Sequence, residues 1–166
     1  KDGGFLQGPI SYQPAQTLKV ALDDDESILR RMRPSTRHDI RHAGRKGVIV
    51  VQAPADIDAI QQFYDLLDET AKRQKFGTHP RAYFEQFLEI FGDDAALLFA
   101  EVDQKPAATM IAVRFGTEAI YLFGGSSTHN RVPGAAASLQ FHAMRWARDS
   151  GCLWYDLWGT EAQSQA

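Results

Sequence analysis

The sequence predicts a mixed α/β domain in which helices cover a mostly antiparallel sheet. Three apolar segments, residues 96–102, 107–115 and 119–123, follow one another with only short turns between them, as in an antiparallel meander. A segment with helical periodicity, residues 135–149, then leads to a last apolar segment at 153–158. A meander followed by a helical crossover into a further strand is typical of a mixed sheet covered by helices.

The composition fits one soluble globular domain. Of the 166 residues, 44% are hydrophobic and 23% are charged, which is ordinary for a folded protein. No apolar segment approaches the roughly 20 residues that span a bilayer, the first residues do not read as a signal peptide, and Cys152 is the one cysteine. We therefore expect a cytoplasmic protein. The net charge of −3 argues against a surface that coats nucleic acid, but it allows a local basic site.

The first part of the chain is predicted to form a short strand, two helices and a buried strand. Residues 17–22 alternate like a strand, and residues 23–32 open with the acidic side chains that suit a helix N-terminus. Pro34 ends that helix and begins the next, residues 34–43, because proline disfavours helical backbone in the residue before it and fits a first turn. The β-branched residues 47–51 then predict a buried strand.

Two amphipathic helices are predicted before the meander. Residues 56–75 carry apolar side chains at helical spacing from Ile57 onward, and a second such pattern begins at Pro80. After the meander, a loop is predicted to begin at Gly124 and to lead into the helix over residues 135–149, because glycine favours loops.

This order of elements resembles that of the GNAT (N-acetyltransferase) superfamily, in which the sheet splays after its fourth strand and the acyl donor lies in the opening. We expect residues 47–160 to form a GNAT-like domain that is truncated at its C-terminus. Residues 1–46 are then the tail of a preceding GNAT-like subdomain with basic connecting helices, and residues 161–166 are a polar tail. Both ends read as cuts through a longer polypeptide.

A row of basic residues marks the helix before this domain. Arg37, Arg41 and Arg45 recur every four residues, and Lys46 follows them. Guanidinium groups match phosphate oxygens in a bidentate manner, so phosphate or the RNA backbone is the expected partner. The alternative is a solvated helix face.

The connection between the two amphipathic helices, residues 70–83, is basic and aromatic. In a GNAT sheet this loop lies over the substrate side. Arg73 and Arg81 are therefore candidates for holding an anionic substrate, and Tyr83 for donating a hydrogen bond to it. An ordinary exposed loop is the alternative.

The predicted strand over residues 119–123, which contains Tyr121, leads into two glycines and two serines. Gly124 allows another backbone to approach closely, and Ser126 offers a hydroxyl group. Taken alone, this pattern also fits an ordinary strand end.

A competing ligand is coenzyme A. Arg131, Gly134 and Ala136 fit the loose R/Q-x-x-G-x-G/A pattern by which GNAT enzymes hold the pyrophosphate of acetyl-CoA at a helix N-terminus. Pro133 removes one amide donor from that cradle. The pattern therefore leaves a CoA-dependent N-acyltransferase as the second hypothesis.

No metal site or general base stands out. The five histidines are scattered, without the spacing of metal ligands, and Cys152 reads as a buried small hydrophobic residue. Asp156 is a candidate base by its chemistry, although an aspartate on a strand is more often structural. A substrate phosphate is the alternative proton acceptor.

Four stretches resemble the Fem family of peptidoglycan aminoacyltransferases. Residues 33–48 are similar to its K-P-K-T-R-Y-N-I-R-L-A-x-R-K-G-V junction, and residues 70–83 to its T-x-x-R-x-x-F…Y-F segment. Residues 121–127 resemble Y-x-Y-G-A-S-S, and residues 151–159 resemble G-C-x-x-Y-D-L-W-G. Together these stretches cover nearly the whole chain.

The resemblance implies transfer of an amino acid from aminoacyl-tRNA to an amino group on the stem peptide of a cell-wall precursor, with no cofactor. Its partners are aminoacyl-tRNA, a muramyl-peptide precursor that can lie at a membrane surface, and a first GNAT-like half of the same polypeptide. By the same resemblance, Arg81 or Arg73, with Tyr83 and Tyr121, contact the precursor. The chain alone is then inactive or nearly so. A third hypothesis is a non-catalytic GNAT-like binding module.

Overall fold

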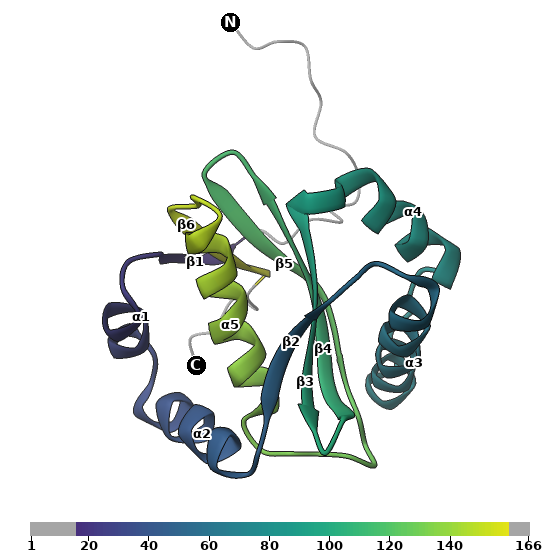
Figure 1. Cartoon of the computed structure of the whole chain (residues 1–166), viewed down its shortest axis with the longest axis horizontal. Coiled ribbons are helices and arrows are strands. Elements are labelled where there is room, and N and C mark those ends of the chain that lie inside the picture. Colours follow the sequence, from purple (N-terminus) through teal and green to yellow (C-terminus); the bar gives the residue numbers. More distant parts are fainter. Residues whose placement is uncertain (1–15, 160–166) are drawn as a thin grey trace, which may run out of the picture.

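The computed structural model describes residues 16–159; residues 1–15 and 160–166, which include the predicted polar tail, lie outside them. One six-stranded sheet has the order β1-β6-β5-β4-β3-β2, with helices on both faces (Figure 1). The elements are, in chain order, β1 (Thr17–Ala21), α1 (Asp25–Arg31), α2 (Pro34–Arg45), β2 (Ile49–Ala53), α3 (Ile57–Gln74), α4 (Arg81–Phe91), a 3₁₀ turn (Gly92–Asp94), β3 (Ala95–Val102), β4 (Lys105–Phe115), β5 (Glu118–Ser126), α5 (Ala135–Asp149) and β6 (Trp154–Gly159).

The predicted fold class is confirmed. Neighbouring strands of the sheet are antiparallel, except β5 and β6, which run parallel. That parallel pair follows from α5, because parallel strands need a crossover connection and a helix is the usual one.

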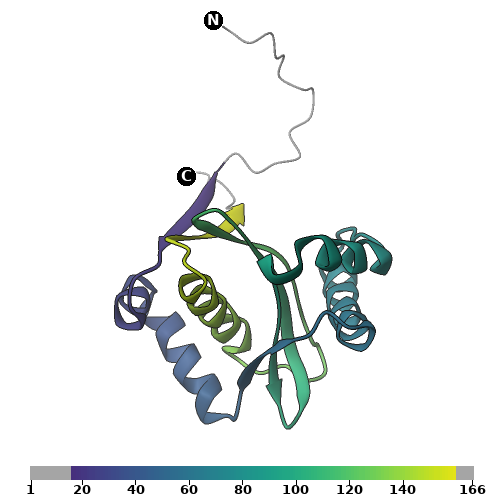
Figure 2. The same ribbon diagram turned by 45° about the horizontal axis from the view of Figure 1, so that its top comes forward.

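The two faces of the sheet bury different side chains. α5, with α1 and α2 beside it, covers one face, and α3 and α4 cover the other (Figure 2). Small side chains of β3 and β4 such as Ala100 and Ala112 pack on the α5 side, whereas Phe99 and Ile111 pack against α3 and α4. Because both faces are covered, these strands read as continuous apolar runs.

β5 and β6 diverge soon after they meet. Their pairing covers only Glu118 to Ile120 of β5, opposite Trp154 to Asp156 of β6. The remainder of β5, residues 121–126, pairs on that side with no strand of the described chain. The sheet therefore opens at this point, as the GNAT resemblance predicted.

β1 belongs to the same sheet as the rest of the chain. It pairs antiparallel with β6, and α2 packs against α5. Residues 17–45 therefore pack on the same sheet and helices as the rest of the described chain. The proposed division of the chain at residue 46 stays a prediction.

The prediction that a loop begins at Gly124 was wrong. β5 continues through Gly124 and Gly125 to Ser126. A Cβ atom on Gly125 would lie 2.5 Å from the carbonyl oxygen of Leu66 in α3. Gly125 therefore permits the close approach of α3 to the sheet, and Gly124 leaves room for the Tyr121 side chain, instead of forming a turn.

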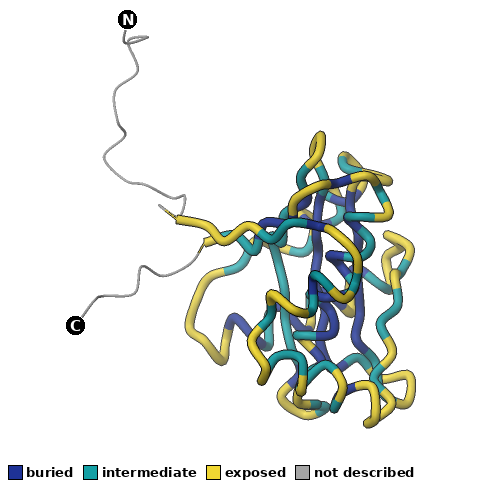
Figure 3. Tube along the Cα trace, turned by 90° about the vertical axis from the view of Figure 1, so that its left-hand side faces the viewer, coloured by how far each residue is buried: buried dark blue, intermediate teal, exposed yellow. Residues whose placement is uncertain are grey.

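Burial follows this arrangement. The strands at the centre are buried and the connecting loops are exposed (Figure 3). Ile57, which the helical pattern placed on the buried stripe, is 63% exposed because it is the first residue of α3. None of the helices within residues 16–159 is both long enough and apolar enough to span a membrane.

Gly134 is predicted to be essential for stability. Its φ of +87° favours glycine, and an added Cβ would lie 2.2 Å from the carbonyl oxygen of Asp39 in α2. Gly134→Ala should lower the free energy of unfolding by about 2 kcal/mol or more, as measured by urea denaturation. The control is Gly44→Ala, where no atom lies within 4 Å and helical backbone favours alanine. Equal stabilities for the two variants would contradict the role of the α2–α5 contact.

Candidate functional site

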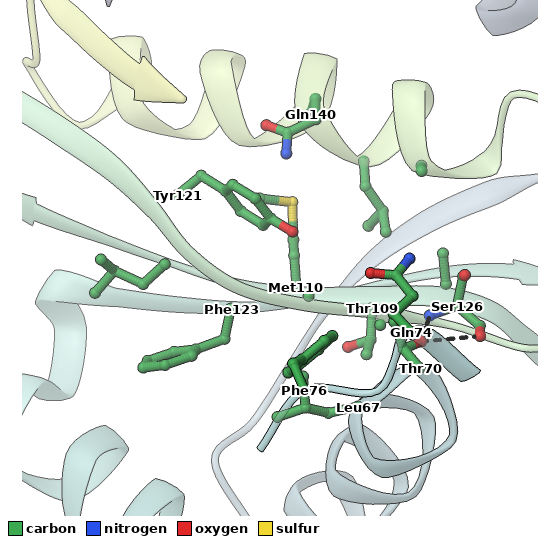
Figure 4. Close-up of a pocket in the computed structure, with 16 residues that line it drawn as sticks. Leu67, Thr70, Gln74, Phe76, Thr109, Met110, Tyr121, Phe123, Ser126 and Gln140 are labelled. Carbon is green, nitrogen blue, oxygen red and sulfur yellow. Dashed lines mark hydrogen bonds between the residues drawn. The ribbon is translucent and has the colours of Figure 1, made fainter. Parts of the chain in front are cut away.

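A cavity of about 370 Å³ opens beside the part of β5 that β6 does not pair (Figure 4). β5 and β4 form its floor, and α3 and α5 form its walls. None of its lining residues carries a charge. They are Leu67, Thr70, Gln74, Phe76, Ala108, Thr109, Met110, Tyr121, Leu122, Phe123, Gly124, Gly125, Ser126, Ala136, Leu139 and Gln140.

The walls arise from helical spacing. α3 contributes Leu67, Thr70 and Gln74, which lie three and four residues apart and so share one face. α5 contributes Ala136, Leu139 and Gln140 in the same manner. The cavity therefore combines apolar side chains with amide and hydroxyl groups.

Tyr121 lies at the floor of the cavity. A Cβ on Gly124 would meet the Tyr121 hydroxyl at 2.4 Å, so that glycine leaves room for the ring. Burial raises the pKa of Tyr121 above its ordinary value, and the hydroxyl therefore stays protonated at neutral pH. No side chain or carbonyl of the described residues accepts a hydrogen bond from it.

Arg73 joins α3 to the end of β5. Its guanidinium donates to the Ser126 carbonyl at 3.1 Å, to the Ser126 hydroxyl at 2.9 Å and to Thr128 Oγ1 at 2.7 Å. The Ser126 amide donates in turn to Thr70 Oγ1 at 2.9 Å. The structure thus brings Arg73 and Ser126 together, and their contacts hold the rim of the cavity.

A second, smaller cavity of about 200 Å³ adjoins this rim. Arg73 and Arg131 both line it, together with Gln74, Ser126 and the loop that follows β5. Gln74 and Ser126 also line the larger cavity. An uncharged cavity and a basic one therefore lie side by side.

Arg81 and Tyr83 lie at the start of α4, beyond both cavities. Arg81 forms an ion pair with Glu85 at 3.3 Å, without the geometry of a hydrogen bond. Tyr83 stacks on His79 with ring centroids 4.1 Å apart. It reaches the cavity only through Phe123, whose ring centroid lies 6.2 Å from its own.

Asp156 of β6 joins that strand to its neighbour β1. It is buried, and its Oδ1 accepts hydrogen bonds from the Thr17 hydroxyl and from the Trp158 amide at 2.7 Å. Trp158 has a positive φ of 62°, a strained backbone conformation that this bond helps to maintain. Asp156 does not line either cavity, and these contacts are those of a structural residue.

The basic side chains of α2 and of the residue after it differ in their contacts. Arg37 turns toward α1 and donates to the Met32 carbonyl at 2.6 Å, which satisfies the end of that helix. Arg41, Arg45 and Lys46 are exposed, and none of them forms an ion pair with a described residue. The exposed part of the predicted row is therefore free to meet an anion.

The residues of the CoA pattern are separated. Arg131 lines the small cavity and Ala136 the large one. Gly134 lies against Asp39 of α2, so contact between helices accounts for the glycine.

The chain matches the FemAB family over residues 8–107 and 103–165. The chain belongs to the FemAB family. The resemblance of its four motifs to Fem proteins is therefore confirmed at the level of the family.

Named relatives agree with this membership. The FemAB chain is 28% identical over 142 residues to the UDP-N-acetylmuramoylpentapeptide-lysine N(6)-alanyltransferase of Weissella viridescens, covering 85% of this chain and 42% of that protein. The crystal structure of FemX superposes with a TM-score of 0.83 at 17% identity, covering 93% of this chain and 56% of that one. The chain thus spans about half the length of these relatives.

The GNAT fold is shared more widely. An acetyltransferase of the GNAT family from Streptococcus pneumoniae superposes with a TM-score of 0.50 at 17% identity, covering 64% of this chain and 70% of that one. At these identities the likeness shows the fold alone.

The sequence did not point to Gln140 as a residue of the site, and it singled out the stretch 70–83 without naming Thr70 or Gln74 as site residues. A signal was present for Gln140, which interrupts the apolar stripe between Ala136 and Ala143 on α5. A polar side chain on a buried helix face needs a partner or a ligand.

Asp156→Ala is predicted to destabilise the FemAB chain. The substitution leaves the Thr17 hydroxyl and the Trp158 amide without their acceptor, and the expected loss in the free energy of unfolding is about 1–3 kcal/mol. Asp156→Asn, which keeps an acceptor oxygen, should lose less. Urea denaturation measures both, with the exposed Asp93→Ala as control. A stable but inactive Asp156→Ala protein would instead favour a role in catalysis.

Proposed function

We propose that the full-length protein transfers an amino acid from aminoacyl-tRNA to an amino group on the stem peptide of a peptidoglycan precursor. Membership of the FemAB family supports this proposal, as does similarity to an enzyme named as an alanyltransferase that acts on a muramoylpentapeptide lysine. The observation that carries it is the uncharged cavity at the opening of the sheet. An uncharged cavity suits an ester and a neutral amine, which are the reacting groups.

The reaction needs stabilisation of charge more than a strong base. The amine nitrogen attacks the ester carbonyl carbon, the new C–N bond forms, and the C–O bond to the tRNA ribose breaks. The proton of the amine ends on the departing ribose oxygen. Negative charge develops on the carbonyl oxygen, where hydrogen-bond donors lower the barrier. Tyr121, protonated at neutral pH, is one such donor.

Proton transfer is assigned to a substrate phosphate. The residues that line the cavity include no aspartate, glutamate, histidine or lysine. Asp156, the side-chain candidate, has its contacts with β1 and with Trp158. A phosphate group of the precursor or of the tRNA, held in the adjoining basic cavity and not in the uncharged one, can relay the proton between amine and ribose.

The small basic cavity is proposed to hold the phosphates of the precursor. Arg73 is fixed there by its bonds to Ser126 and Thr128, and Arg131 faces the same space. A rigid guanidinium loses little conformational entropy when it binds an anion. Arg81, with Tyr83 beside it, would contact parts of the precursor that extend beyond the cavity.

The exposed face of α2 is proposed to contact the tRNA backbone. Arg41, Arg45 and Lys46 offer three neighbouring charges. The likeness to relatives about twice as long supports a requirement for a further GNAT-like half, without which we expect little or no turnover.

The choice of donor is the decisive test. The full-length protein, given a muramyl pentapeptide and either charged tRNA or acetyl-CoA, should acylate the peptide only from charged tRNA, as measured by mass spectrometry. Transfer from acetyl-CoA alone would overturn the proposal in favour of the CoA pattern at Arg131 to Ala136. Affinity without turnover from either donor would identify a binding module.

Neutralising the basic face should weaken tRNA binding. Arg41→Gln with Arg45→Gln is expected to raise the KM for aminoacyl-tRNA about 3- to 10-fold and to make it less dependent on salt, because each lost phosphate contact reduces counterion release. The control is Lys72→Gln, an exposed residue of α3 on the opposite face of the sheet that pairs with Asp68. Equal KM values for the two proteins would exclude α2 from the tRNA site.

A further inference from the structure

A buried tyrosine hydroxyl that does not itself line the large cavity holds one of the side chains that do. Tyr155 of β6 is 0% exposed. Its hydroxyl donates to Oε1 of Gln140, on α5, at 2.9 Å. Burial raises the pKa of Tyr155 well above its ordinary value, so the hydroxyl remains a donor throughout the neutral range.

The orientation of the Gln140 amide follows from this bond. Because its oxygen accepts from Tyr155, its nitrogen is turned the other way, from α5 toward the strands that floor the cavity (Figure 4). No group of the described residues accepts a hydrogen bond from that nitrogen. Its two N–H groups are therefore presented to the cavity.

The rest of the lining limits what can accept those bonds. The cavity contains no charged residue, so an anionic group would lose its hydration without gaining a counter-charge. A neutral carbonyl oxygen avoids that penalty and accepts from an amide. Apolar neighbours such as Met110 and Leu139 are suited to the carbon atoms beside it.

We infer that the Gln140 amide binds a carbonyl oxygen of a substrate in the large cavity, and that Tyr155 is the positioning residue that fixes the amide. The inference rests on the proposed aminoacyl transfer and names a group that this reaction needs. The carbonyl belongs either to the aminoacyl ester or to the stem peptide. An ester carbonyl and a stem-peptide carbonyl predict different changes in kcat and KM when the contact is removed.

Kinetics of Gln140→Met in the full-length protein test the contact, because methionine keeps the length of the side chain and removes both N–H groups. If the carbonyl is that of the ester, kcat should fall about 10²-fold, as when one oxyanion donor is removed. If it belongs to the stem peptide, the KM for the muramyl pentapeptide should rise about 10-fold, as for a lost hydrogen bond. The control is Gln61→Met, an exposed glutamine of α3 that donates to Asp65.

Tyr155→Phe tests the positioning role. It should reproduce part of the Gln140→Met defect, about 3- to 10-fold, because the amide then rotates freely. Added to Gln140→Met, it should cause no further loss in kcat or KM, since the two act through one contact. An additive loss would show that Tyr155 supports the fold alone. Wild-type kinetics for Gln140→Met would overturn the inference and leave the proposed transfer standing.

A binding measurement keeps the inference testable if the full-length protein transfers nothing. Glutamine side chains labelled with ¹⁵N are observed by NMR, and the Gln140 signals are assigned by their loss in Gln140→Met. The probes are the amide analogue of an aminoacyl-adenosine ester and the muramyl pentapeptide. A shift of the Gln140 signals with one probe supports the contact and identifies the source of the carbonyl. No shift with either probe overturns it.

Discussion

The cavity depends on the close approach of two backbones. Strand β5 passes α3 so tightly that a single methyl group at Gly125 would overlap the main chain at Leu66. β5 lies against α3 at this approach, and β6 pairs with β5 only as far as Ile120, so the sheet opens between the two strands. Thr70 and Arg73 then secure the approach by bonding to Ser126. The cavity is thus held by backbone contact and by a polar network at its rim.

The separation of charge around the opening follows from the same arrangement. Side chains of α3 and α5 that face inward pack on apolar strands, so they are apolar or carry only amides and hydroxyls. Arginines lie at the rim, with Arg73 on the last turn of α3 and Arg131 in the loop after β5, and on the outer face of α2. A substrate with a neutral reactive end and a charged remainder fits that pattern.

The fold was largely predictable because each element carries a local signal. The helices have apolar stripes, and Pro34 and Gly151 mark boundaries that the structure reproduces. The strand predicted as buried at residues 47–51 is instead the edge strand β2, with no buried residue. β5 was a second exception, since Gly124 and Gly125 signal a loop in sequence and a close approach in space. Only the contact of β5 with α3 shows that these glycines allow a close approach and do not form a loop.

The site was less predictable, because its residues are defined by partners distant in sequence. Tyr121, Gly124 and Ser126 were found from one stretch of chain. Gln140 gains its role from Tyr155, which follows it by fifteen residues on another element. Arg37 was placed with Arg41 and Arg45 by spacing, yet its contacts are with the carbonyls at the end of α1. Spacing along a helix identifies the residues that share a face, but tertiary contacts decide which of those side chains remain free to bind a ligand.

The pairing of β1 with β6 has a consequence for how the molecule folds. Thr17 and Asp156, which bond across that pair, are 139 residues apart in the sequence, whereas β3, β4 and β5 join through short turns. Local pairings form readily, and distant ones must wait for a larger loop to close. We expect the meander to assemble first, with β1 remaining without a partner until the last strand arrives. Among the strands of residues 16–159, the first to leave the ribosome is thus among the last to be incorporated.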